Sequence, residues 1–457
     1  MDTITTRCHT KMGSGSSYRR FWVSSLPALI RNVQSSRNIS KVVLTILTLS
    51  LFRLGSLCAP VHAQNAGAFK GSLDDPAIGY ATGPLDNVVE DVNRQLRDGA
   101  VGFTFNDRSG FLRSALDALR LHVDSQLLVF SRGSLQGKRI GEQNPRAIYF
   151  NDRVALGWVR GGNVLEVAAH DAHQGVVFYT LDQHADATGP PQFKRSFICL
   201  GCHVTGDSLG VPGLLMFSTT RPEPGEFDGV PRHIDQSDPL ERRFGGWFVT
   251  GNAGAVPHMG NNASVLDGLP TRELASVGRL SDNDGYPTLT SDIVAHLVLT
   301  HQAGMTNLLT RAGFEARSAQ GDPTAIAAVM DAVAREVVDH LLFVDEAALP
   351  APIKGNSGFA ERFSASGPKD RKGRSLYQLD LTRRLFKYRC SYLIYSPAFD
   401  ALPARIKSRI YHRMWTVLST WPRETRQPIV EILLDTKKDV PPDVTEAASS
   451  RSGRSSH

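Results

Sequence analysis

The chain has 457 residues, of which 41% are apolar, and this is enough for two ordinary domains with hydrophobic cores. A formal net charge of +6 would suit a protein that binds nucleic acid or an anionic membrane. The positive excess lies at the amino terminus, however, because residues 64–457 hold 43 of the 51 basic residues and 44 of the 45 acidic ones. This even balance excludes nucleic acid as the expected partner.

Residues 1–63 are predicted to be an export signal. Lys41 precedes an apolar run, Val42–Phe52, that is too short for a comfortable transmembrane span. Val61-His62-Ala63 resembles the small-residue site where signal peptides are cleaved, so cleavage is expected after Ala63. The protein is therefore expected in the periplasm or otherwise exported, with a membrane contact only through the signal segment if it stays uncleaved.

The front half of the mature chain is predicted to hold a short helix and then several strands. Residues 64–105 are rich in Gly, Asp and Asn and are expected to be an extended segment. The stretch "SGFLRSALDALRLH" places Leu112, Leu116 and Leu119 on one face of a helix. The strand-like runs that follow are "QLLVF", "RAIYF", "VALGWV", "VLEVA" and "GVVFYTL".

From about Ser291 the pattern becomes helical. Asp322-Pro323 is a helix start, and apolar residues then recur at spacings of three and four. The stretch "PARIKSRIYHRMWTVLS" repeats this pattern. We therefore predict an α+β fold with a β-rich front domain over residues 64–285, a mainly helical domain over residues 286–440 and a disordered tail over residues 441–457.

The segment "FICLGCHVTGDSLG" carries the clearest chemical signal. It places Cys199 and Cys202 three residues apart, with His203 directly after the second cysteine. Removal of the signal leaves Cys390 as the only other cysteine. An odd number of cysteines in an oxidising compartment argues against a disulfide framework.

This spacing suits covalent attachment of haem c. Cysteines at i and i+3 lie on one side of a helical turn and can reach the two vinyl groups at one porphyrin edge, while the adjacent histidine can reach the iron. Haem attachment takes place outside the cytoplasm, so this interpretation requires an export signal, and the sequence independently predicts one. The alternatives are a redox dithiol, a zinc site and chance, but a zinc site needs two further ligands and a dithiol does not need His203.

The sequence also resembles a set of exported bacterial single-haem proteins of the cytochrome c class. The resemblance covers most of residues 105–420 and is carried by "NPRAIYFND", "LGWVRGG", "FYTLDQ", "CLGCH", "FGGWFVTGNAGAVPHMGNN" and "CSYLIYSPAFDALP". It implies that Cys199 and Cys202 are the thioether anchors and that His203 is the proximal ligand of the haem iron. It also implies electron transfer as the class of function.

The identity of the second axial ligand decides the chemistry. A second strong ligand makes an electron carrier, whereas an open position permits catalysis at the iron. The stretch "GNAGAVPHMGNN" offers Met259 or His258, and adjacent side chains in an extended loop cannot both bind. Met216 in "GLLMF" is expected to be a core residue, and His301 and Met305, one helical turn apart, are expected to be either packing residues or part of a solvated helix face.

These observations predict an exported c-type cytochrome that binds one covalent haem and carries single electrons between redox partner proteins whose identity is open. A haem enzyme, either peroxidase-like or the haem subunit of a periplasmic oxidoreductase, is the alternative, because the chain is much longer than one haem requires. A haem-based sensor that docks a partner through its helical half is a third possibility.

Overall fold

The computed structural model describes residues 67–185, 189–219, 230–254, 256–261, 276–278 and 284–441. Contacts within the chain divide it into two units, residues 1–63 and residues 64–457, and all described residues belong to the second unit. The predicted export signal and all but the first residue of the predicted tail lie outside the described residues. Among the described residues, no helix combines the length and apolarity needed to cross a membrane.

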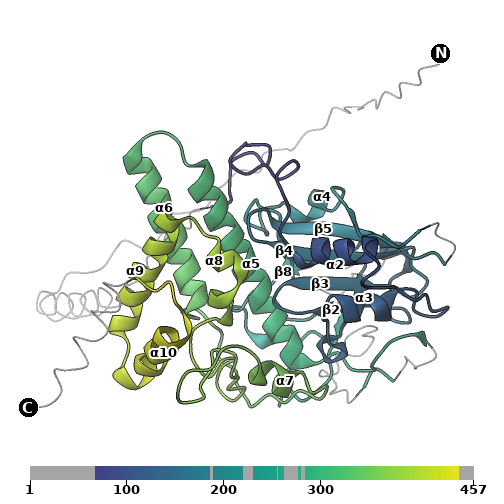
Figure 1. Ribbon diagram of the computed structural model, residues 1–457. Coiled ribbons are helices and arrows are strands. Elements are labelled where there is room, and N and C mark those ends of the chain that lie inside the picture. The colour runs from purple at the N-terminus through teal and green to yellow at the C-terminus, as the bar shows by residue number, and fades with distance from the viewer. Residues whose placement is uncertain are drawn as a thin grey trace, which may run out of the picture. The chain divides into compact units, whose positions relative to one another are not determined.

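Seven strands form one antiparallel sheet in the order β6-β5-β4-β3-β2-β1-β9 (Figure 1). From β1 to β6 each strand pairs with the next along the chain, so most of the sheet is a meander. Strands β7 and β8 pair separately. The bounds are β1 Leu127–Val129, β2 Arg146–Phe150, β3 Val154–Trp158, β4 Val164–Asp171, β5 Gly175–Asp182, β6 Lys194–Arg195, β7 Phe217–Thr219, β8 Pro231–His233 and β9 Trp247–Phe248.

One face of this sheet carries large apolar side chains packed against helices α2 (Val88–Arg97) and α3 (Leu112–Ala118). We call it the packed face. Side chains alternate across a strand, so every second residue of β2 to β5 belongs to the same cluster. The members from these strands are Ala147, Tyr149, Val154, Leu156, Trp158, Leu165, Val167, Ala169, Val177, Tyr179 and Leu181.

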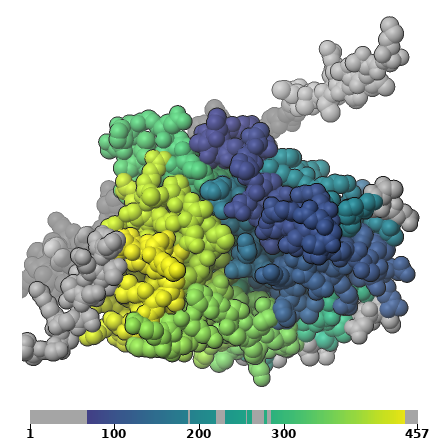
Figure 2. Space-filling view, in the orientation of Figure 1, coloured from purple at the N-terminus to yellow at the C-terminus, as the bar shows by residue number. Residues whose placement is uncertain are grey.

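The opposite face, which we call the cavity face, looks toward the helices of the back half. Helix α5 contacts β5, α6, α7, α8 and α9, and it shares one hydrophobic cluster with β1 and β2. Figure 2 shows the blue front-half residues and the yellow C-terminal helices on opposite sides of the visible face. The helices are α4 Leu200–His203, α5 Ile293–Ser318, α6 Pro323–Leu341, α7 Phe359–Ala365, α8 Pro397–Asp400, α9 Ala404–Thr420 and α10 Arg423–Thr436.

The α+β prediction is confirmed, since the front half is an antiparallel sheet and the back half is helical. The helix beginning after Asp322 is also confirmed, because that carboxylate accepts the Ala325 amide 2.8 Å away. The expectation of an extended segment over residues 64–105 is wrong where α2 forms. Its valines and Leu96 make a narrow apolar stripe, and the other residues of the helix are polar, so the sequence shows little helical periodicity there.

The predicted boundary between residues 285 and 286 falls inside the unit formed by residues 64–457. One hydrophobic cluster there contains side chains from both sides of that boundary, including Phe150 on β2 and Leu297 on α5. The β-rich and helical parts therefore share buried surface.

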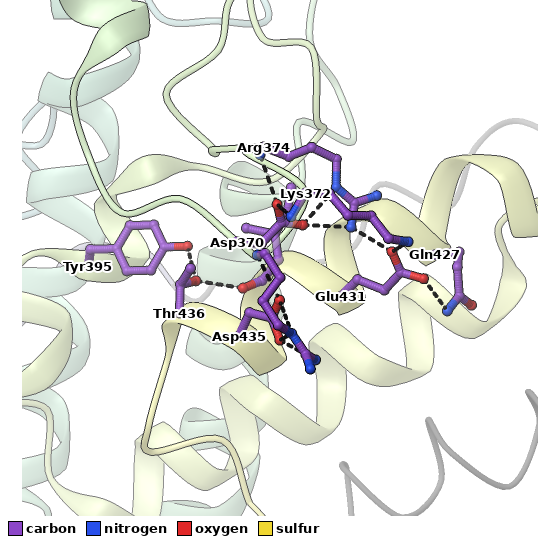
Figure 3. Close-up of polar contacts among 10 residues, drawn as sticks. Asp370, Lys372, Arg374, Tyr395, Gln427, Glu431, Asp435 and Thr436 are labelled. Atoms are coloured by element: carbon purple, nitrogen blue, oxygen red, sulfur yellow. Dashed lines mark hydrogen bonds and ion pairs between the residues drawn. The ribbon is translucent and has the colours of Figure 1, made fainter.

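A charged network fastens the loop over residues 370–374 to α10 (Figure 3). Glu431 accepts from Lys372 at 2.7 Å and from Arg374 at 2.5 Å. Arg371 forms a bidentate pair with Asp435, whose nearest atoms are 2.7 Å apart. These contacts hold the C-terminal helix in place and lie away from the cysteine motif.

Candidate haem site

Helix α4 is a single turn that presents the two cysteines and the histidine. The amides of Cys202 and His203 both donate to the carbonyl of Cys199, at 3.1 and 3.0 Å. All three residues therefore lie on one helical turn, as the spacing predicts. Cys199 is half-buried and Cys202 is exposed, and both are free thiols.

His203 is held in one tautomer by the backbone. Its Nδ1 lies 2.8 Å from the carbonyl oxygen of Gly213, which can only accept, so Nδ1 carries the proton. The Gly213 amide donates back to the His203 carbonyl at 3.1 Å. Burial lowers the pKa of His203, which favours the neutral ring. A neutral imidazole protonated at Nδ1 keeps the Nε2 lone pair for a metal.

Asn307 on α5 fixes the segment that orients His203. Its side-chain oxygen accepts the Leu214 amide, and its amide nitrogen donates to the Leu214 carbonyl, each at 2.8 Å. A Cβ on Gly213 would lie 2.3 Å from the same side-chain oxygen, so a glycine is needed there. The histidine is therefore oriented from a helix about a hundred residues further along the chain.

Cys199 and His203 line a cavity between α4, the cavity face and α5. On the sheet the small residues Ala155, Gly157 and Ala168 line it together with Ile148 and Phe178. The Phe178 ring lies 4.6 Å from the His203 ring. Trp247 on β9 also lines the cavity, and the other side chains that reach it from outside the sheet belong to Leu214, Leu215, Met216, Leu299 and Ala303.

One charged pair interrupts this apolar lining. Arg146 on β2 and Glu166 on β4 lie 2.7 Å apart, and both line the cavity. Arg146 was not among the residues that the sequence singled out, and no spacing in the sequence links these two positions.

Met259 and His258, the two predicted second ligands, lie close to the cavity but not among the residues that line it. The Met259 amide donates to the Arg243 carbonyl at 2.9 Å, and the Ser218 hydroxyl lies 3.6 Å from the Met259 sulfur. His258 is buried, its Nδ1 accepts the Gly260 amide at 3.1 Å, and burial lowers its pKa to about 4. Backbone contacts therefore fix both residues.

Trp247 connects this loop to the wall of the cavity. Its ring lines the cavity, and its carbonyl accepts the Asn261 amide from the same loop at 2.8 Å. Met216 is 3% exposed and belongs to the larger hydrophobic cluster, as expected of a core residue. It also lines the cavity, which the sequence did not indicate.

Helix α5 carries two histidines, His296 and His301, and both are buried. His301 lies between Gln236 Oε1 at 2.6 Å and Ser391 Oγ at 2.7 Å, so it is part of a packing network rather than of a solvated face. Met305 on the same helix is fully buried. His296 donates from Nδ1 to the Asp292 carbonyl at 2.9 Å and packs against the Trp247 ring.

The donor set fits a covalently bound haem. Two free thiols and an imidazole protonated at Nδ1 lie on one turn, beside an apolar cavity. The cavity volume is about 120 Å³, below the range of small-molecule sites and smaller than a haem. A haem would therefore extend from the cavity to the surface at Cys202, where Phe197 and Ile198 are 48% and 69% exposed.

No group of three or more His, Cys, Asp or Glu side chains suited to a metal ion occurs in the part of the chain that the structure describes. Comparisons of the chain with models of protein families, with curated proteins and with solved structures found no match. The function is therefore proposed from the geometry of the site alone.

Proposed function

We propose that this protein is an exported c-type cytochrome that binds one haem through Cys199 and Cys202 and carries single electrons. The orientation of His203 is the observation that carries the proposal. A carbonyl oxygen 2.8 Å from Nδ1 fixes the tautomer that leaves Nε2 for iron, next to two cysteines on the same turn. When bound, the haem supplies the change between Fe(III) and Fe(II).

The chain's own residues set the conditions for that change. Cys199 and Cys202 would hold the porphyrin edge, and His203 would bind the iron from one side. Asn307 positions His203 through Gly213 and raises the basicity of the ligand indirectly, because the Gly213 carbonyl accepts the Nδ1 proton. The apolar lining keeps water from most of the site, which favours the less charged Fe(II) state.

The second ligand is proposed to come from the loop over residues 256–261, as Met259 or His258. The loop is bound to a residue of the cavity wall, because the Asn261 amide donates to the backbone carbonyl of Trp247. Met216 is the competing candidate because it lines the cavity already.

Covalent haem retention is the first test. The full chain, expressed together with the haem attachment machinery, should keep its haem after denaturation in acid acetone. Cys199→Ala combined with Cys202→Ala should abolish retention. Cys390→Ala is the matched control, since this thiol is fully buried away from the motif and should leave retention unchanged. Absence of haem from the wild-type chain would overturn the proposal.

The optical spectrum of the oxidised protein is the second test. An electron carrier should show six-coordinate, low-spin iron, and a weak band near the red end would mark methionine as the second ligand. Met259→Ala, His258→Ala and Met216→Ala should then identify the ligand, because only one of them should convert the iron to high spin.

A haem enzyme remains the second candidate, and the placement of His258 and Met259 favours it. Neither residue lines the cavity that contains His203, so the iron could have an open position. High-spin iron in the wild-type protein, unchanged in all three variants and responsive to added peroxide, would replace the electron carrier with this function.

A further inference from the structure

The Arg146–Glu166 pair crosses an intervening strand of the sheet. Glu166 on β4 lies opposite Gly157 on β3, and Gly157 lies opposite Ile148 on β2. Arg146 is two residues before Ile148 and therefore on the same face. Its guanidinium passes over β3 at Gly157 to reach the Glu166 carboxylate 2.7 Å away.

Gly157 makes this crossing possible. A Cβ at that position would lie 2.5 Å from Nη2, 2.6 Å from Nε and 2.9 Å from Cζ of Arg146. Real Cβ atoms do not approach heavy atoms so closely, so any larger residue at position 157 would push the guanidinium away. The glycine thus holds the Arg146 charge flat against the floor of the cavity.

Glu166 is fixed by further partners on its far side. Its Oε1 accepts from the Ser134 hydroxyl at 3.0 Å and from the Gln136 side-chain amide at 3.1 Å. Only Oε2 is used by Arg146. The carboxylate is therefore anchored independently of the arginine, and it fixes the position of the guanidinium rather than following it.

The arginine keeps donors that have no acceptor within the part of the chain that the structure describes. Its Nε is buried and makes no hydrogen bond. A guanidinium has five N–H donors, and the contact with Glu166 is made by Nη2 alone. The Arg146 side chain is 20% exposed and lines the cavity, so its outer edge, rather than the covered Nε, is what a ligand there can reach. A carboxylate matches the fork of a guanidinium best.

We propose that Arg146 is the carboxylate-binding residue of this cavity. The inference rests on the proposed function, under which the carboxylate is a propionate of the bound haem. A small carboxylate from solution offers the same chemistry and is the second source. Arg160 and Arg243 do not serve this role, because neither of them lines the cavity.

The main test measures the reduction equilibrium of the haem-loaded full chain. Arg146→Gln removes a positive charge near the iron, which stabilises the oxidised form. The ratio of oxidised to reduced protein at a fixed mediator potential should therefore rise about tenfold, which corresponds to a reduction potential lower by about 59 mV for one electron. Gly157→Ala keeps the charge but displaces it and should shift the equilibrium in the same direction by less. Arg94→Gln is the matched control, because Arg94 also pairs with a carboxylate but is 62% exposed on α2. It should change nothing.

Titration with formate distinguishes the two sources. If a propionate occupies Arg146, the spectrum of the loaded wild type should not respond to formate. If the carboxylate comes from solution, the wild type should respond with saturation, and Arg146→Gln should not. Either result supports the proposal. An unchanged equilibrium in Arg146→Gln, together with no formate response in the wild type, overturns it.

Failure of the proposed function is separable from failure of this inference. If the wild type carries no covalent haem, the thermal midpoint of the haem-free chain is measured with and without formate. Formate should raise the midpoint of the wild type and of Arg94→Gln, but not of Arg146→Gln. Equal midpoints with and without formate in all three proteins would overturn a carboxylate site at Arg146.

Discussion

The two faces of the same sheet differ in what fills them. The packed face carries Tyr149, Leu156, Trp158 and Tyr179 against α2 and α3, and these side chains are almost completely buried. The cavity face of the same strands carries Ala155, Gly157 and Ala168 beside a charged pair, with Ile148 and Phe178 as its larger side chains. A fold needs one well-filled face for stability. Room and charge on the other face are not required for folding, and under the proposed function they serve the bound haem.

The largest expected effect comes from truncating the packed face. Leu156 is fully buried there, so Leu156→Ala should lower the free energy of unfolding by about 2–5 kcal/mol through lost burial and a new void. Denaturant unfolding of the purified protein measures this. A loss below about 1 kcal/mol would contradict the view that this face carries the stability.

Acid should destabilise the protein through buried histidines on the side of the cavity face. Burial lowers the pKa of His170 to about 4 and that of His296 to about 3, against about 6.5 in the unfolded chain. The unfolded state therefore binds more protons as the pH falls below about 6.5, and stability is lost from there down toward pH 4. Each histidine contributes at most about 1.4 kcal/mol per pH unit in this window.

The measurement is the unfolding free energy at pH 7, 6 and 5. His296→Gln should flatten the pH dependence, whereas His173→Gln is the control because that side chain is exposed. A wild-type stability that stays constant between pH 7 and pH 5 would contradict the prediction.

Alkali should act on the packed face instead. Burial raises the pKa of Tyr80 to about 12, and burial also raises that of Tyr149. The unfolded chain loses these protons first, above about pH 10, so stability should fall as the pH rises from about 10 toward 12. Unfolding curves followed by tyrosine absorbance report this loss. Tyr80→Phe should reduce the pH dependence.

Filling the cavity should separate binding from stability. Ala168 lines the cavity, where added carbons find room, so Ala168→Leu should cost less unfolding free energy than the same change at a well-packed position while reducing covalent haem content. Ala169→Leu is the matched comparison, because Ala169, the neighbour of Ala168 on β4, faces the packed side and is fully buried. That variant should lose stability. Equal behaviour of the two variants would remove the distinction between the faces.

The smallest effect is expected at the edge of the sheet. Lys194 on β6 pairs with Asp182 on β5 at 2.6 Å, and its side chain is 68% exposed. An exposed pair of this kind contributes about 0–1 kcal/mol. Lys194→Gln should therefore leave both stability and haem content near wild type in the same two assays.

Local patterns in the sequence predicted much of the fold because they act over few residues. The strand "RAIYF" has the predicted bounds, and the helix after Asp322 begins where it is predicted to begin. Residue periodicity does not predict helix α2, because its apolar stripe is only a few residues long and most of its surface is polar. Its stability comes from packing of Val89 and Val92 against the sheet, which no local pattern reveals.

By itself, the sequence determined the turn that carries Cys199, Cys202 and His203, because the spacing of these residues alone places them on one side of a helical turn. The tertiary structure decided which nitrogen of His203 carries the proton, since Asn307 on the distant helix α5 fixes the segment whose Gly213 carbonyl accepts from Nδ1. It also decided that Gly157 and Glu166 hold Arg146 against the cavity floor. Register between strands sets that contact, and register depends on the whole sheet.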